Sequence, residues 1–254
     1  MELFDLTGKV AIITGSSKGI GRAIAETLAR EGCGVAFCAR NAGEVAMTVQ
    51  ALSVHGTQIT GTTLDVADAE ALARWVATAG ADFGGLDIVV ANVSALAIPG
   101  DEENWKKGFE IDLMGTVRLV NAAMPLLEKS RHASIVTISS VSGREIDFAA
   151  GPYGAFKAAI IHYTQGLAYH LAGKGIRANS VSPGNTYFPG GVWNQIEVGN
   201  PELYKMALGL NPTGRMGTPQ EMANAAAFLA SPAASFITGT NLVVDGALTK
   251  GVQF

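Results

Sequence analysis

The stretch KVAIITGSSKGIG, residues 9–21, decides the fold class of this 254-residue chain. Its first half, Lys9–Thr14, is apolar on both faces, which is typical of a parallel strand covered by helices on both sides. Its second half, TGSSKGIG at residues 14–21, is a glycine-rich turn that leads into a helical pattern at Ile20. A strand, a glycine-rich turn and a helix in this order predict the first unit of a doubly wound α/β sheet.

The glycines of this turn also indicate a ligand. Gly15 permits the tight turn, Gly19 lets the backbone approach a pyrophosphate, and Gly21 allows the helix to pack closely on the strand. The free N–H groups at the start of the helix would point at the phosphates. A plain turn between a strand and a helix is the alternative. Its position at the first crossover favours a dinucleotide site, formed by Gly15, Ser17, Lys18, Gly19, Ile20 and Gly21.

Short apolar runs and longer helical patterns alternate along the rest of the chain. Further strands are expected at Gly34–Cys38, Gln58–Leu64, Asp87–Ala91, Ser134–Ser139, Arg177–Val181 and Asn241–Val244. Helices are expected near Ile20–Arg30, Glu44–Val54, Ala69–Phe83, Glu103–Glu128, Tyr153–Leu171 and Pro219–Leu229. The series predicts a Rossmann-like parallel sheet of about seven strands with helices on both faces, built by residues 1–254 as a single domain.

Composition excludes several classes of protein. Hydrophobic residues make up 48% of the chain and charged residues 16%, which argues against disorder. The net charge of −4, without runs of like charge, gives no basis for binding nucleic acid. Cys33 and Cys38 cannot form a disulfide framework, and no His or Cys cluster has the spacing of a metal site. No signal peptide or membrane span is evident, so we expect a cytoplasmic protein.

Two cations indicate which dinucleotide is bound. Arg40 follows the second expected strand, where a site for NAD(H) would carry an acidic residue, and Lys18 lies in the glycine turn. Both suit a ribose 2′-phosphate, so NADP(H) is favoured over NAD(H). The alternative is that both are solvated surface charges.

Three residues form a candidate catalytic set. Ser140 lies at the carboxyl edge of the sheet, where ligands bind to such folds. Tyr153 and Lys157 are four residues apart on the next helix and therefore share one face. A nearby ammonium and a helix N-terminus favour the ionised phenol. Tyr153 could then exchange a proton with a substrate oxygen to which Ser140 is hydrogen-bonded.

Together these motifs resemble the short-chain dehydrogenase/reductase family over nearly the whole chain. Besides TGSSKGIG, Ser140 and YGAFK, the matching segments are LDV at residues 64–66, Pro183–Gly184, GRMGTPQEMA and ITGTNLVVDG. The resemblance implies hydride transfer between nicotinamide and a carbonyl or secondary alcohol carbon. It implies that Tyr153 is the acid or base and that Lys157 binds the nicotinamide ribose and makes the phenol more acidic. The further cofactor contacts that it implies are Asp65, Val66, Asn92, Pro183, Gly184 and Thr186.

Three departures from the family pattern bear on the site. The NNAG motif reads ANVS here, which retains Asn92 and places Ser94 beside the nicotinamide ring. Asp112 stands where the family has a proton-relay asparagine, so it is a candidate catalytic residue. It would be either a carboxylate paired with Lys157 or a side chain that is protonated or turned into a helix hydrogen bond. PGNTYF replaces PGxxxT, so Thr186 is expected to contact the nicotinamide amide.

The substrate is expected to bind under a lid. Residues 185–215 lie in an irregular stretch that is rich in Gly, Pro and aromatic residues. The expected wall residues are mainly apolar, with one charged pair: Ser94, Leu96, Arg144, Glu145, Phe148, Tyr187, Phe188 and Trp193. This set favours a medium-sized, partly hydrophobic ketone or alcohol.

The helix after Tyr153 is also expected to take part in contacts between subunits. Its small residues would permit close helix packing, and in the family the corresponding helices form an intersubunit bundle, so a homotetramer or a homodimer is expected. A nucleotide-binding regulator with the same fold and no turnover is the remaining alternative, because a fold does not fix a function. The intact catalytic set argues for an enzyme.

Overall fold

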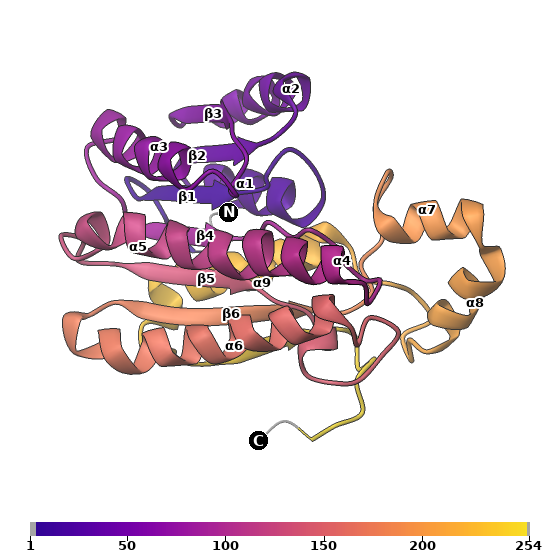
Figure 1. The fold of residues 1–254 in the computed structure, drawn as a ribbon. Coiled ribbons are helices and arrows are strands. Elements are labelled where there is room, and N and C mark those ends of the chain that lie inside the picture. The colour runs from indigo at the N-terminus through magenta and orange to yellow at the C-terminus, as the bar shows by residue number, and fades with distance from the viewer. Residues whose placement is uncertain (1–3, 253–254) are drawn as a thin grey trace.

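The computed structural model of the protein describes residues 4–252, and a sheet of seven parallel strands forms its centre (Figure 1). The strand order is β3-β2-β1-β4-β5-β6-β7. The strands are β1 (Val10–Thr14), β2 (Gly34–Ala39), β3 (Ile59–Thr63), β4 (Ile88–Ala91), β5 (Ser134–Ile138), β6 (Arg177–Pro183) and β7 (Asn241–Val244). The chain starts in the middle of the sheet and builds outward in both directions, which confirms the predicted doubly wound fold.

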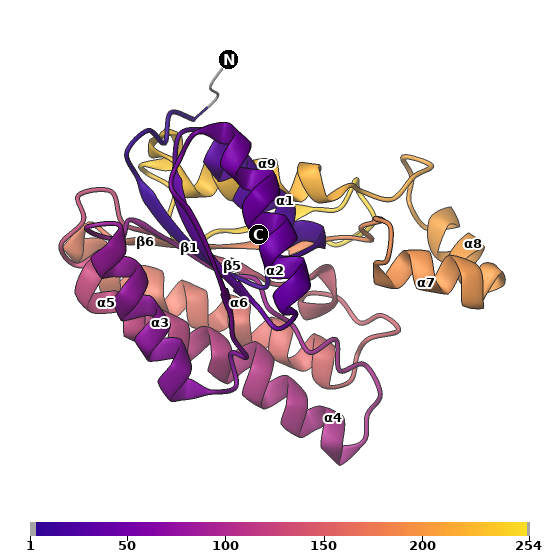
Figure 2. The same cartoon turned by 90° about the horizontal axis from the view of Figure 1, so that it is seen from above.

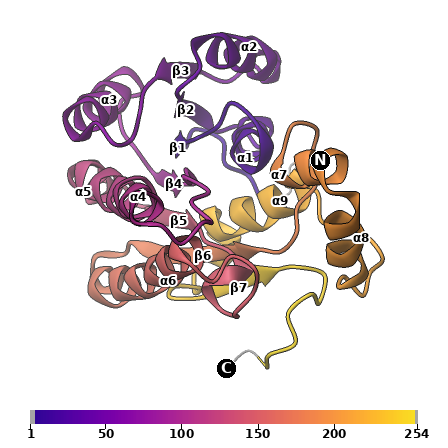
Figure 3. The same ribbon diagram turned by 45° about the vertical axis from the view of Figure 1, so that its right-hand side comes forward.

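Helices cover both faces of the sheet (Figure 3). One layer contains α1 (Gly19–Arg30), α2 (Ala42–Leu52) and α9 (Pro219–Ala230). The other contains α3 (Ala69–Asp82), α4 (Glu102–Lys107), α5 (Gly115–Leu127) and α6 (Pro152–Leu171). Within residues 4–252, none of the helices has both the length and the apolar character needed to cross a membrane.

The central strands fill both layers because successive side chains point to opposite faces. Ile13 and Val90 belong to the apolar cluster beneath α1 and α9, whereas Ile12 and Val89 belong to the cluster beneath α3 and α5. All four side chains are 0% or nearly 0% exposed. Burial on both faces explains why these strands read as continuous apolar runs in the sequence.

The expected helix over Glu103–Glu128 is interrupted. A π-helical segment, Gly108–Met114, separates α4 from α5. It begins where the ring of Phe156 covers Gly108 so closely that a Cβ on the glycine would lie 2.6 Å from a ring carbon. A π turn takes up an extra residue, which the apolar periodicity of the sequence does not reveal. The interruption lies next to the candidate site, because it contains the buried Asp112.

The expected irregular lid instead contains two helices, α7 (Val192–Gly199) and α8 (Pro201–Gly209), which project from the body of the protein (Figure 2). The glycine and proline residues mark the helix ends: Gly191 is the N-cap of α7, and Pro201 begins α8 after the N-cap Asn200. The side chain of Asn200 accepts a hydrogen bond from the backbone N–H of Leu203 at 3.2 Å. Reading these residues as breaks in regular structure was wrong.

Candidate active site

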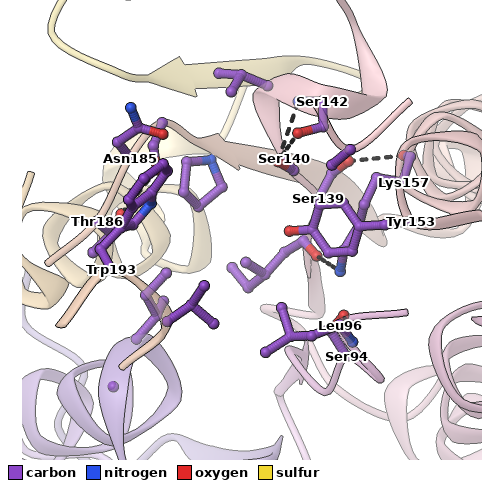
Figure 4. A pocket seen from close by; sticks show the side chains of 18 of the residues that line it. Ser94, Leu96, Ser139, Ser140, Ser142, Tyr153, Lys157, Asn185, Thr186 and Trp193 are labelled. Carbon is purple, nitrogen blue, oxygen red and sulfur yellow. Dashed lines mark hydrogen bonds between the residues drawn. The ribbon is translucent and has the colours of Figure 1, made fainter. Parts of the chain in front are cut away.

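Ser140, Tyr153 and Lys157 meet at the carboxyl edge of the sheet and line one cavity of about 280 Å³ (Figure 4). Ser140 follows β5, and Tyr153 lies in the first turn of α6, which begins at Pro152. Lys157 lies one helical turn later, with its Nζ 5.6 Å from the centre of the Tyr153 ring. The chain order of these elements therefore brings the predicted catalytic set together.

Lys157 is held by polar partners although its side chain is only 2% exposed. Its Nζ donates a hydrogen bond to the backbone carbonyl oxygen of Ile138 at 3.1 Å and lies 3.4 Å from Asp112 Oδ1. An ammonium group out of contact with water requires such partners, because its desolvation is costly. The Lys157 charge is thus fixed beside the Tyr153 ring.

The side chain of Asp112 lies against Lys157 and is not turned into a hydrogen bond of its own helical segment. Its Oδ1 faces Lys157, and its Oδ2 accepts a hydrogen bond from the backbone N–H of Ala95 at 2.8 Å. The side chain is 2% exposed, and its Oδ1 has no hydrogen-bond partner within the described residues. The carboxylate therefore joins the π-helical segment to the loop after β4 and lies against the ammonium.

The glycine turn has the shape that the sequence indicates. Gly15 and Gly19 have φ angles of +73° and +58°, in the region that favours glycine. A Cβ on Gly21 would lie 2.3 Å from the carbonyl oxygen of Gly15. Asn92 braces the turn, since its Nδ2 donates to the carbonyl oxygens of Thr14 at 3.1 Å and Gly15 at 3.0 Å.

A second cavity of about 630 Å³ lies on the other side of the glycine turn. Seven of the expected cofactor contacts line it: Gly15, Ser17, Lys18, Arg40, Asp65, Val66 and Asn92. Lys18, Asn92 and Ser94 line both cavities, so the two meet at these residues. An elongated ligand can therefore reach from one to the other past the start of α1.

Glu44 is a residue of this cavity that the sequence analysis missed. Its Oε2 accepts a hydrogen bond from Ser17 Oγ at 2.6 Å, and its Oε1 lies 3.9 Å from Lys18 Nζ. Glu44 is in the first turn of α2, which Asn41 caps by accepting a hydrogen bond from the Glu44 N–H at 3.0 Å. The sequence signal that could have identified it is an acidic residue shortly after Arg40, at the start of the following helix.

The substrate side of the smaller cavity agrees only in part with the expected wall. Ser94, Leu96, Phe148, Phe188 and Trp193 line it, together with Ile98, Val192, Ser142 and Asp147, which the sequence analysis did not single out. Phe148 and Trp193 pack edge to face with ring centres 5.7 Å apart. The wall is mainly aliphatic and aromatic, as expected.

Three residues that the sequence analysis expected in the substrate wall, Arg144, Glu145 and Tyr187, do not line this cavity. Arg144 is exposed, and Glu145 Oε1 accepts a hydrogen bond from the backbone N–H of Gly251 at 2.9 Å. The Tyr187 hydroxyl donates to Glu197 Oε2 at 2.5 Å, which raises the pKa of this phenol. The spacing of loop residues does not determine the direction of their side chains.

The end of β6 and the residues after it connect the expected lid to the glycine turn. Pro183, Gly184 and Thr186 line the smaller cavity. Thr186 Oγ1 donates a hydrogen bond to the Gly184 carbonyl oxygen at 3.0 Å. The ring of Phe188 covers Gly19, where a Cβ would lie 2.6 Å from a ring carbon. The start of the lid thus lies directly against the turn.

The thiols of Cys33 and Cys38 are free, and both are buried out of reach of a partner for disulfide exchange. Burial raises the pKa of Cys38 to about 12 and raises the pKa of Cys33 as well. Such thiols remain protonated and unreactive at neutral pH.

Comparisons with known proteins all indicate the same protein family. The family model described as enoyl-(acyl carrier protein) reductase matches residues 15–249. An isoepoxydon dehydrogenase of Penicillium expansum is 40% identical over 254 residues, which cover 98% of this chain and 98% of that protein.

Solved structures agree with this assignment. A 7α-hydroxysteroid dehydrogenase complexed with NADH and 7-oxo glycochenodeoxycholic acid has a TM-score of 0.89 and 31% identity, over 95% of this chain and 94% of that one. An NADPH-bound short-chain oxidoreductase of Pseudomonas aeruginosa with an atypical catalytic centre has a TM-score of 0.90 and 28% identity, over 98% and 100% of the two chains. The protein belongs to the short-chain dehydrogenase/reductase family and is an oxidoreductase that acts on CH–OH or C=O groups.

Proposed function

We propose that the protein is an NADP(H)-dependent enzyme that interconverts a medium-sized, partly hydrophobic ketone and the corresponding secondary alcohol. The observation that carries this proposal is the convergence of Ser140, Tyr153 and Lys157 on one cavity beside the glycine turn. A protein that only bound nucleotides would not need a phenol, a hydroxyl and a buried ammonium around the same space.

The residues around the two cavities fit a dinucleotide. The N-cap of α1, Lys18, makes no side-chain capping bond, so the first N–H groups of the helix remain available to phosphate. A side chain at Gly21 would collide with the Gly15 carbonyl, so the tight cradle depends on glycine. The cradle, the uncapped helix and the two joined cavities match the phosphates and the two halves of such a ligand.

The nicotinamide would supply or accept the hydride, and the protein would manage the proton. In ketone reduction, the Tyr153 hydroxyl gives its proton to the substrate oxygen as the carbonyl carbon becomes an alcohol carbon. The Ser140 hydroxyl binds the same oxygen, and the Lys157 ammonium stabilises the phenolate that remains. Lys157 would also bind the nicotinamide ribose. Asp112 and the Ile138 carbonyl hold the ammonium in place.

Arg40 and Lys18 support the preference for NADP(H). Both line the larger cavity, and Arg40 is exposed there. Lys18 and Ser17 are both directed to Glu44. A 2′-phosphate would compete with this carboxylate for the two groups and would gain Arg40 as a further partner. NAD(H) is the alternative cofactor, favoured by the nearby negative charge of Glu44.

A direct assay separates the candidate functions. The protein is mixed with NADPH or NADH and a panel of ketones, and absorbance of the reduced nicotinamide is followed, while cofactor binding is measured in parallel. Turnover with NADPH supports the proposal, turnover with NADH alone supports the alternative cofactor, and binding without any turnover supports the non-catalytic regulator.

We also propose that the active form is a homotetramer, with a homodimer as the alternative. Trp105 and Phe109 are 41% and 46% exposed, and both rings pack against Phe156 of α6. A cluster of exposed aromatic rings on neighbouring helices is the kind of surface that subunit contacts cover. The molar mass in solution, measured by light scattering, tests this assembly.

A further inference from the structure

Asp147 and Ser142 are polar groups in the active-site cavity that the proposed proton transfer does not use. Ser142 Oγ donates a hydrogen bond to Asp147 Oδ2 at 2.6 Å, and Asp147 Oδ1 accepts one from the backbone N–H of Ala149 at 2.8 Å. Both side chains line the same cavity as Ser140 and Tyr153. Ser142 lies beside Ser140 in Figure 4.

The direction of these hydrogen bonds is fixed by the carboxylate. An ionised carboxylate can only accept, so the Ser142 hydroxyl must donate to Asp147. Ser142 Oγ can then only accept from its neighbour, and Ser140 Oγ donates to it across 3.3 Å, a long contact that Ser140 would give up to donate to a substrate oxygen. The hydrogen bonds therefore run from Ser140 through Ser142 to the carboxylate of Asp147. Each oxygen of this carboxylate can still accept one more hydrogen bond.

The residues around the Asp147 carboxylate determine which ligand groups it can bind. Phe148, Trp193 and Leu96 give the same cavity apolar walls. Its two lysines, Lys157 and Lys18, lie against Asp112 and Glu44, and Arg144 does not line it. A carboxylate in such a place attracts hydroxyl or ammonium donors and repels substrate anions. The two contacts place Asp147 Oδ2 at most about 6 Å from Ser140 Oγ, so a hydroxyl that binds Asp147 would lie one or two carbons from a carbonyl carbon whose oxygen is bound at Ser140.

We propose that Asp147 is a specificity residue that binds a second hydroxyl of the substrate, so that the enzyme prefers hydroxyketones and polyols to simple ketones and keto acids. This inference rests on the proposed function, because it assumes that the substrate oxygen binds at Ser140 and Tyr153. A charge-assisted hydrogen bond of this kind corresponds to about 10- to 150-fold in discrimination.

The test compares matched substrates within each variant. Initial rates with NADPH and with NADH are measured for cyclohexanone and 2-hydroxycyclohexanone, and for 2-butanone and 3-hydroxy-2-butanone. Wild type is expected to favour the hydroxylated member of at least one pair by about tenfold or more in kcat/KM. In Asp147→Asn this ratio should fall at least fivefold. The amide can still accept from the Ala149 N–H, which preserves the turn.

Two further measurements separate substrate binding from a structural role. Asp147→Asn should also gain in relative kcat/KM for pyruvate against 2-butanone, because the repelling charge is gone. Glu145→Gln removes a neighbouring carboxylate that does not line the cavity and should leave every ratio as in wild type. Each result is the ratio of kcat/KM for two substrates of the same variant. A general loss of active enzyme lowers both values equally and leaves this ratio unchanged.

The outcomes distinguish the two proposals. Turnover of ketones by wild type without preference for either hydroxylated member, or an unchanged ratio in Asp147→Asn, overturns the assignment of Asp147 and leaves the oxidoreductase proposal standing. Failure to reduce any of the ketones with either cofactor refutes the proposed function, and the assignment of Asp147 falls with it.

Discussion

Replacing Asp112 with asparagine should shift the pH dependence of alcohol oxidation toward lower pH. The carboxylate lies 3.4 Å from Lys157 Nζ, and it offsets part of the positive charge that the Tyr153 ring experiences from 5.6 Å away. An amide keeps the shape and the acceptor oxygen for the Ala95 N–H but removes the negative charge. Since the phenolate would then face an uncompensated ammonium, it forms at lower pH.

The geometry sets the size of this effect. The two distances place Asp112 Oδ1 at most about 9 Å from the centre of the Tyr153 ring. At an effective dielectric constant of about 20, two charges at this separation interact by roughly 1.8 kcal/mol, which corresponds to somewhat more than one pH unit. Water in the open cavity weakens the interaction about twofold. The expected shift of the acid limb is therefore about half a unit to one unit.

The assay is the pH profile of kcat for alcohol oxidation, measured with the alcohol and with its deuterated form. A primary isotope effect in both proteins would show that the profile reports hydride transfer and its coupled proton transfer. Glu128→Gln is the matched control, because it removes a carboxylate that pairs with Lys174 on the surface. Superimposable acid limbs for wild type and Asp112→Asn, with the isotope effect expressed in both, would refute the reasoning.

The remaining predictions concern the phenol, the cofactor, the lid and acid stability. Tyr153→Phe should lower turnover by at least ~10²-fold and leave NADPH affinity little changed; normal turnover would remove the phenol from the mechanism. Arg40→Asp should weaken NADPH binding by about 10- to 150-fold in titration calorimetry while NADH binding is retained, and equal NADPH and NADH affinities in wild type would contradict the cofactor assignment. Residues 185–215 should gain hydrogen-exchange protection when NADP and substrate are added, whereas equal protection would mean a fixed element. The Arg215 guanidinium and the Thr218 N–H hold the pKa of Glu221 at about 2 against its usual 4.5, so the stability that these contacts provide is present above about pH 4.5 and is lost as the pH falls toward 2. Urea midpoints should therefore fall more steeply over this range in wild type than in Glu221→Gln, and parallel curves would count against this contribution.

The strands were predictable because their signal is local and strong. Asn241–Val244 agrees in both bounds, and the other strands agree within one or two residues. Runs buried on both faces leave little choice of secondary structure, and short crossovers leave little choice of topology. The meeting of Ser140 with Tyr153 and Lys157 follows from the same rules, since the carboxyl ends of parallel strands share one edge.

The features that were missed depend on contacts made only after folding. The π-helical segment begins at Gly108, which the ring of Phe156 covers. The sequence carries no signal of this contact between two elements. Asp147 enters the cavity while its near neighbour Arg144 remains outside, because the turns after Ser140 set the directions of both side chains. Glu44 was missed for the same reason: its role depends on the loop that brings Ser17 within reach.

The hydrogen bonds from Asn92 mean that the shape of the glycine turn depends on a distant part of the chain. The turn belongs to residues 14–21, yet its carbonyl groups are held by an amide that follows β4, and the hydrogen bond from Asn92 to Thr14 spans 78 positions of the chain. During synthesis, the N-terminal strand, turn and helix exist well before this partner can arrive. An isolated fragment that ends before β4 would therefore lack the shape that binds a dinucleotide. The Asn92 contact requires β4 to be paired with β1 at the centre of the sheet, so we expect cofactor affinity to appear together with this pairing.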